Sequence, residues 1–181
     1  MIVALLGSAS EESITRRGVL ALSEQVRSAG AAFVLLDLRT EFRRLHDLAD
    51  YAAPAAGGQT AELRARIAQA SGVVLATPVY HGSYSGLLKN ALDHLTGEAL
   101  VGLPVGTMAA GGGVRSASVA CDHLRSVIRA MGGWSTPTHV GMSSADFTDE
   151  GPTADLRQRI ADMVAELLSF PARDAFRNGA P

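Results

Sequence analysis

The chain of 181 residues has the length of one domain, or of one domain with a short tail, and its 47% hydrophobic and 19% charged residues argue against disorder. The net charge of −2 gives no electrostatic reason to expect a nucleic-acid partner. The single cysteine, Cys121, excludes an intrachain disulfide and a cysteine-rich metal cluster, and it fits a reducing compartment.

The first expected element is an apolar run at residues 2–6, which ends at Gly7 and has the pattern of a buried parallel strand. No basic region precedes this run and it is too short to cross a membrane, so we expect a cytoplasmic protein without membrane contact. A helix follows from about Ile14, and Gly30 is expected to end it. Residues 33–37 have the pattern of the next strand.

Residues 39–58 show no periodic pattern and contain a proline–glycine loop. A helix is expected to begin near Thr60, which has the side chain of an N-cap residue, and to stop at Gly72. Residues 73–77 then predict the third strand.

The later elements alternate in the same way. They are expected as a loop at 78–85, a helix at 85–95, a strand at 103–109, a glycine turn at 111–113, a helix at 115–131, a strand at 136–140 and a helix at 155–168. The strand at 136–140 is the weakest of these, because Pro137 has no N–H for a sheet ladder. We expect a loosely ordered tail at 171–181.

Five alternations of strand and helix predict an α/β fold with helices on both faces of a parallel sheet. Five strands in this length fit the flavodoxin-like strand order 2-1-3-4-5, in a single domain that spans residues 1–170. In such a sheet, ligands bind outside the carboxyl ends of the strands, near the point where the strand order reverses. The loops after the first, third and fourth strands are therefore the candidate site.

The first of these loops carries four hydroxyls, from Ser8, Ser10, Ser13 and Thr15. Hydroxyls and amides at a helix N-terminus can hold a phosphate without a lysine. The alternative interpretation is a serine-rich N-cap, which needs only one of these side chains.

The second loop, 77–86, holds two tyrosines, His81 and Gly82, which suit a flat heterocyclic ligand. The alternative interpretation is a well-packed surface loop, which would have the same residues. The third, 109–113, has almost no side chains, so its backbone could approach a ligand closely or simply form a flexible turn.

Taken together, the three loops resemble those of the NAD(P)H-dependent FMN reductase family over roughly residues 1–168. The first family motif, Gly-Ser-x-x-x-x-Ser-x-Thr, is matched at Gly7, Ser8, Ser13 and Thr15. The second and most specific motif is matched at Pro78, Tyr80, Ser83, Ser85, Gly86, Leu88, Lys89, Asn90 and Asp93. A Gly-Gly turn after the fourth strand is matched at Gly111 and Gly112.

The resemblance implies an enzyme that transfers a hydride from NADPH or NADH to FMN and that passes reduced flavin to an acceptor, for example a flavin-dependent monooxygenase. It implies that FMN is held by Ser8, Ser10, Ser13, Ile14, Thr15, Pro78, Val79, Tyr80, His81, Gly82, Ser83, Ala110, Gly111 and Gly112. It also implies a homodimer or homotetramer, in which Lys89, Asn90 and Asp93 have architectural roles.

One departure concerns the first loop. Many relatives have Pro-Arg where this chain has Ala9-Ser10, so Arg16 or Arg17 would have to replace that arginine as a phosphate partner. No catalytic side chain is expected, because the cofactors carry the chemistry. His81 is interpreted either as an ordinary loop residue or as a group that tunes the flavin. The five histidines show no metal-ligand spacing, so no metal is expected.

Alternatives remain for the function. A quinone or azo reductase with bound FMN would carry the same loops, and a flavodoxin-like electron carrier would bind FMN without oxidising NAD(P)H. A relative that has lost FMN would bind no flavin at all.

Overall fold

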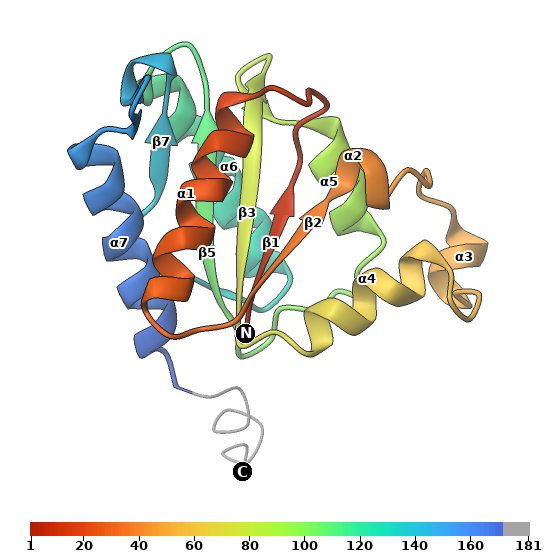
Figure 1. Cartoon of the computed structure of the whole chain (residues 1–181). Coiled ribbons are helices and arrows are strands. Elements are labelled where there is room, and N and C mark those ends of the chain that lie inside the picture. Colours follow the sequence, from red (N-terminus) through yellow and green to blue (C-terminus); the bar gives the residue numbers. More distant parts are fainter. Residues whose placement is uncertain (172–181) are drawn as a thin grey trace.

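The computed structural model describes residues 1–171, which fold around one parallel sheet (Figure 1). Its long strands are β1 (Ile2–Leu6), β2 (Phe33–Asp37), β3 (Gly72–Tyr80) and β5 (Pro104–Ala110). The strands lie in the order β2-β1-β3-β5, and two short strands, β6 (Trp134–Ser135) and β7 (Val140–Met142), both pair with β5 at the far edge. This is the flavodoxin-like order 2-1-3-4-5, as the sequence predicts.

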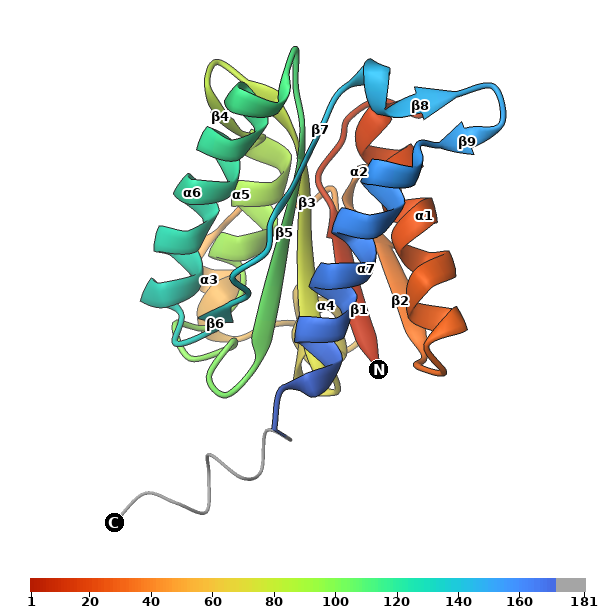
Figure 2. The same cartoon turned by 90° about the vertical axis from the view of Figure 1, so that its left-hand side faces the viewer.

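Helices cover both faces of the sheet (Figure 2). On one face lie α1 (Ile14–Ser28) and α7 (Ala154–Ser169), and on the other lie α4 (Gln59–Ala68), α5 (Gly86–Asp93) and α6 (Val114–Ala130). Because side chains alternate along a strand, Ala4 packs in the core with Leu22 of α1, whereas Leu5 packs in the core with Leu88 of α5. None of the helices within residues 1–171 combines the length and the apolar character needed to cross a bilayer.

The segment without a periodic pattern holds two short helices, α2 (Leu38–Glu41) and α3 (Leu48–Ala52). Near the C-terminal helix, a 3-10 turn η1 (Ser144–Asp146) leads into a small antiparallel hairpin of β8 (Phe147–Thr148) and β9 (Gly151–Pro152). Only Pro171 of the expected tail at 171–181 belongs to the described residues.

The prediction of a strand at 136–140 is wrong for most of its length. β6 ends at Ser135 and β7 begins at Val140. The amide of Thr136 still donates to Val105 of β5 at 3.0 Å, and residues 137–139 leave the ladder. Pro137 has no N–H to donate. Thr138 turns instead toward α7, where Glu166 accepts its amide at 2.9 Å and its hydroxyl at 2.5 Å. These polar contacts divide the last strand into two pieces.

The helix expected near Thr60 begins one residue earlier, at Gln59, but the N-cap role expected for Thr60 is wrong. Gly58 is the N-cap of α4, and its carbonyl accepts the first helical hydrogen bond from the amide of Glu62 at 3.0 Å. Thr60 lies inside the first turn, where its buried hydroxyl bonds to His94 and Asp50 rather than to the helix backbone.

The region expected as a loop at 78–85 contains more regular structure than its sequence indicates. β3 continues to Tyr80, and β4 (Ser83–Tyr84) folds back along it as an antiparallel hairpin.

Candidate functional site

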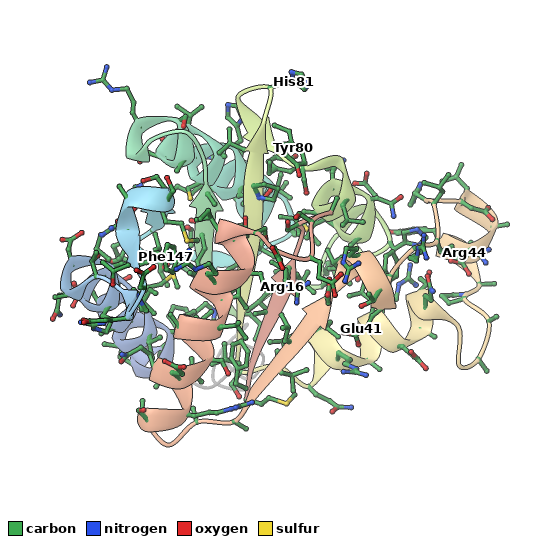
Figure 3. All side chains as sticks on the ribbon, turned by 45° about the horizontal axis from the view of Figure 1, so that its top comes forward. Arg16, Glu41, Arg44, Tyr80, His81 and Phe147 are labelled. Atoms are coloured by element: carbon green, nitrogen blue, oxygen red, sulfur yellow. The ribbon has the colours of Figure 1, made fainter. Side chains whose placement is uncertain are left out.

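The three loops that follow β1, β3 and β5 lie at the same edge of the sheet (Figure 3). The first two are joined by Ser85, whose hydroxyl donates to the carbonyl of Gly7 at 2.6 Å. The amide of Gly7 in turn donates to Ala76 on β3 at 2.8 Å. The backbone that leaves β1 is therefore fixed against the end of β3 before it enters the serine-rich loop.

The first loop ends at the N-terminus of α1. Ser13 is the N-cap, and its hydroxyl accepts the amide of Arg16 at 3.1 Å. Thr15 lies in the first turn and is 1% exposed, and its hydroxyl has no hydrogen-bond partner among the described residues. The hydroxyl of Ser8 is also buried and accepts the amide of Ser10 at 3.3 Å. An unpaired buried hydroxyl beside the positive end of a helix can serve an anion.

The two arginines of the first turn differ, because only Arg16 has a carboxylate partner among the described residues. Arg16 forms an ion pair with Asp37 at the end of β2, with 2.5 Å between Nη2 and Oδ2. The guanidinium of Arg17 stacks 4.3 Å from the ring centroid of Phe147. Glu11 and Glu12 are exposed, so they do not occupy the helix terminus. The positive potential at this loop therefore comes from the helix dipole, the backbone amides and Arg17, which lines the same surface hollow as Ser13 and Ile14.

The second loop is a tight hairpin. Val79 pairs with Tyr84 and Tyr80 pairs with Ser83, and the turn between them has positive φ at His81 (50°) and Gly82 (79°). Positive φ at both central residues is the pattern of a type I′ turn, which matches the twist of a hairpin. Tyr80 is 46% exposed and lies with His81 at the rim of the sheet edge (Figure 3).

The third loop contains two glycines in different surroundings. A Cβ on Gly111 would lie 2.7 Å from the hydroxyl of Ser116 and 3.1 Å from Cγ2 of Val79, whereas a Cβ on Gly112 would meet nothing within 4 Å. Gly111 also donates its amide to Met142 at 3.0 Å. Gly111 is therefore required by packing, and Gly112 borders open space.

The structure brings the sequence-predicted residues of all three loops to one edge. The helix that follows the second loop makes contacts within itself and with the segment before α3. Lys89 pairs with Asp93 at 2.6 Å, and the side chain of Asn90 bonds to the backbone of Arg44 and of His46. Sequence reasoning missed His123, whose Nδ1 lies 2.9 Å from the hydroxyl of Ser83. No pattern in the sequence links these two residues, because they lie on different elements.

The buried titratable side chains outside the three loops include Asp50, His94 and Cys121. His94 is fully buried, and burial is the main cause that lowers its pKa. Burial raises the pKa of the Cys121 thiol to about 11. Within residues 1–171, no three His, Cys, Asp or Glu side chains are grouped as a metal site would require.

The sequence model of the NADPH-dependent FMN reductases matches residues 1–147. The chain belongs to this family. Among its relatives, the FMN-dependent NADPH-azoreductase of Staphylococcus saprophyticus is 39% identical over 118 residues, which are 62% of this chain and 61% of that protein. The protein of the same name from Staphylococcus aureus (strain USA300) is 42% identical over 115 residues, or 60% of this chain and 61% of the relative. The matched region spans about three fifths of these relatives.

Solved structures share the fold of this family member over nearly its whole length. The apo form of NADH:FMN oxidoreductase (EMOB) superposes with a TM-score of 0.79 at 26% identity, covering 97% of this chain and 92% of that chain. Azoreductase AzrA superposes with a TM-score of 0.62 at 17% identity, covering 92% of this chain and 96% of that chain.

Proposed function

We propose that this protein binds FMN at the three loops and catalyses its reduction by NADPH or NADH. The observation that carries the proposal is the buried, unpartnered hydroxyl of Thr15 at the N-terminus of α1, in a chain whose residues 1–147 match the family model. Leaving a buried hydroxyl unpaired costs about 1–3 kcal/mol, so the site is complete only when another group accepts from it. A phosphate oxygen is such an acceptor.

The three loops divide the cofactor between them. The phosphate would lie at the α1 terminus, on Ser8, Ser10, Ser13, Ile14 and Thr15. The hairpin would border the isoalloxazine ring through Pro78, Val79, Tyr80, His81, Gly82 and Ser83. The glycine turn would approach the other edge of the ring through Ala110, Gly111 and Gly112, where the space beside Gly112 leaves room for a ligand.

When bound, FMN supplies the hydride chemistry, and the side chains of this protein need only hold and orient the ring and keep water away from it. Tyr80 offers a flat, partly exposed surface for that purpose. No general acid or base is assigned.

The acceptor of the electrons is a second part of the proposal. The staphylococcal relatives are named azoreductases, and this favours an azo compound or a quinone of similar shape, reduced at the open side of the ring. Delivery of free reduced flavin to a partner monooxygenase is the other route. Steady-state rates with an azo dye, a quinone and free FMN, each with NADPH, would rank the three acceptors.

We further propose a cytoplasmic homodimer or homotetramer. Two prominent apolar side chains support self-association, since Leu45 is 80% exposed and Leu48 is 76% exposed. Leu48 lines an open groove of about 520 Å³ that also includes Leu92, Val127 and Met131. Apolar surface of this kind is normally covered. Light scattering after size exclusion would give the oligomeric state, and a Leu45→Ser, Leu48→Ser variant should shift it toward monomer.

The deciding experiment is a titration of the purified protein with FMN, followed by NADPH. We expect the bound flavin to show a perturbed absorbance near ~450 nm that bleaches with NADPH. Flavin that binds but does not bleach would indicate an electron carrier. A protein that binds no flavin would overturn the proposal.

The phosphate loop has its own test in a Ser13→Ala, Thr15→Ala variant, titrated with FMN and with riboflavin, which has no phosphate. Hydrogen bonds to a charged group contribute about 1.5–3 kcal/mol each, so FMN affinity should fall about tenfold or more while riboflavin affinity stays constant. Unchanged FMN affinity would show that these hydroxyls do not hold the phosphate.

A further inference from the structure

One hydrogen bond joins the second loop to a helix that is distant in sequence. The hydroxyl of Ser83, in β4, lies 2.9 Å from Nδ1 of His123, in the middle of α6. Both side chains are close to solvent, and His123 is otherwise a surface residue of the helix. The contact therefore does not serve the core.

The effect of this contact reaches the rim of the candidate site through the hairpin. Ser83 pairs directly with Tyr80 in the antiparallel ladder, and only His81 and Gly82 lie between them. The positive φ of both turn residues fixes the connection. Displacement of Ser83 would therefore move Tyr80 with it.

The base of the hairpin is held separately. The amide of Ser85 donates to the hydroxyl of Thr77 at 2.8 Å, and the hydroxyl of Ser85 donates to Gly7 at 2.6 Å. These buried contacts fix the start and end of the hairpin, but they do not reach its tip. A two-residue ladder is weak by itself, so the tip needs a lateral support.

We propose that His123 is a positioning residue that holds Ser83, and through it Tyr80, against the isoalloxazine ring of the flavin. The role rests on the proposed FMN site, because it needs a ring at the hairpin. This role involves α6 in flavin binding, although His123 belongs to none of the three loop motifs.

The test compares His123→Ala, Ser83→Ala and the double variant with the unchanged protein. His123→Asn is the rescue variant, because its side-chain amide can return a polar atom near the position of Nδ1. His139→Ala is the matched control: it removes a similar contact, between Nε2 of His139 and the hydroxyl of Ser118 on the same helix, at 3.0 Å. Fluorescence titration gives the affinities for FMN and riboflavin, and visible circular dichroism reports the surroundings of the bound ring.

The support acts on the ring and not on the phosphate. His123→Ala should therefore lower the affinities for FMN and for riboflavin by the same factor, about two- to tenfold for one hydrogen bond. The circular dichroism of the bound flavin should change as well. The double variant should bind flavin no more weakly than Ser83→Ala alone, since Ser83→Ala already removes the contact with His123. Asparagine should restore most of the affinity, and His139→Ala should leave it unchanged.

Amide hydrogen exchange adds a readout that needs no flavin, and residues 79–84 should exchange faster in His123→Ala than in His139→Ala. If the unchanged protein binds flavin and His123→Ala binds it equally well with the same dichroism, the positioning role is wrong. Equal losses in His123→Ala and His139→Ala would also overturn it. A failure of the unchanged protein to bind flavin would instead refute the proposed function.

Discussion

Ser85 and Gly7 are 78 residues apart, and the hydrogen bond between them, 2.6 Å from hydroxyl to carbonyl, closes the base of the candidate site. The same hydroxyl accepts the amide of Leu88 at 3.1 Å and so caps α5. One buried side chain thus aligns two loops and begins a helix.

Ser85→Ala should destabilise the protein by about 1–3 kcal/mol, because it leaves a buried carbonyl unpaired and removes a helix cap. Urea unfolding measures this loss. Ser169→Ala is the control, since its hydroxyl is exposed and donates to the carbonyl of Glu166 alone within residues 1–171, and we expect it to change stability by less than about 0.5 kcal/mol. Equal midpoints for the two variants would contradict the role of Ser85.

Thr15→Val should lower the affinity for FMN without lowering the stability of the flavin-free protein. Valine keeps the shape of threonine without the unpaired hydroxyl, so the flavin-free protein should be as stable as before or more stable by about 1 kcal/mol. FMN affinity should nevertheless fall, and riboflavin affinity should not. Thr15→Ser, which retains the hydroxyl, serves as the control. A loss of stability in the flavin-free valine variant would mean that the hydroxyl has a partner in the folded chain.

The two glycines of the third loop should respond differently to alanine. Gly111→Ala would place a Cβ against Ser116 and Val79, and such overpacking costs about 1–3 kcal/mol. Gly112→Ala meets no protein atom within 4 Å, so folding should be unaffected while the methyl group enters the space proposed for the ring. Thermal unfolding together with FMN titration tests both expectations. Full FMN affinity in Gly112→Ala would move the ring away from this turn.

The lowered pKa of His94 predicts that the stability of the fold depends on pH. Burial, then the neighbouring charge of His46, lowers its pKa below the ordinary value, although Asp50 acts in the opposite direction. The unfolded chain therefore binds more protons at this side chain than the folded chain does, in the window below about pH 6.5. Stability should be complete above that window and should fall as the pH decreases through the lowered pKa.

Urea unfolding at about pH 7.5 and about pH 5.5 measures this loss, and the difference between the two values should shrink in His94→Gln. His81→Asn changes an exposed histidine and should keep the difference of the unchanged protein. A pH dependence that survives unaltered in His94→Gln would assign it to other groups.

The sequence predicted the elements that carry a continuous apolar run or an apolar stripe at helical spacing. The run at residues 2–6 and the apolar stripe of α1 face a core, and this pattern is local. The short helix α3 has no such stripe. Its preceding segment is held by distant side chains, because Gln59 accepts the amides of Arg43 and Arg44, and Asn90 accepts that of His46. Contacts of this kind leave no spacing in the sequence.

The meeting of the three loops was predictable because parallel strands end at one edge of a sheet. The hydrogen bonds that hold these loops in place were not predictable. The hairpin depends on a positive φ at His81, which is uncommon for a residue other than glycine, and the contacts of Ser85 with Gly7 and of Ser83 with His123 join separate elements. Motifs therefore identified the loops, whereas the structure shows what holds them in place.

The burial of Cys121 affects how the protein responds to oxidants. The thiol is the only one in the chain, it is buried, and its pKa of about 11 keeps it protonated at neutral pH. A thiolate is the nucleophile that attacks a peroxide or a disulfide, and a protonated, enclosed thiol supplies no thiolate for either reaction. The folded chain should accordingly resist inactivation by peroxide through oxidation of its thiol, and should form no intermolecular disulfides during storage in air.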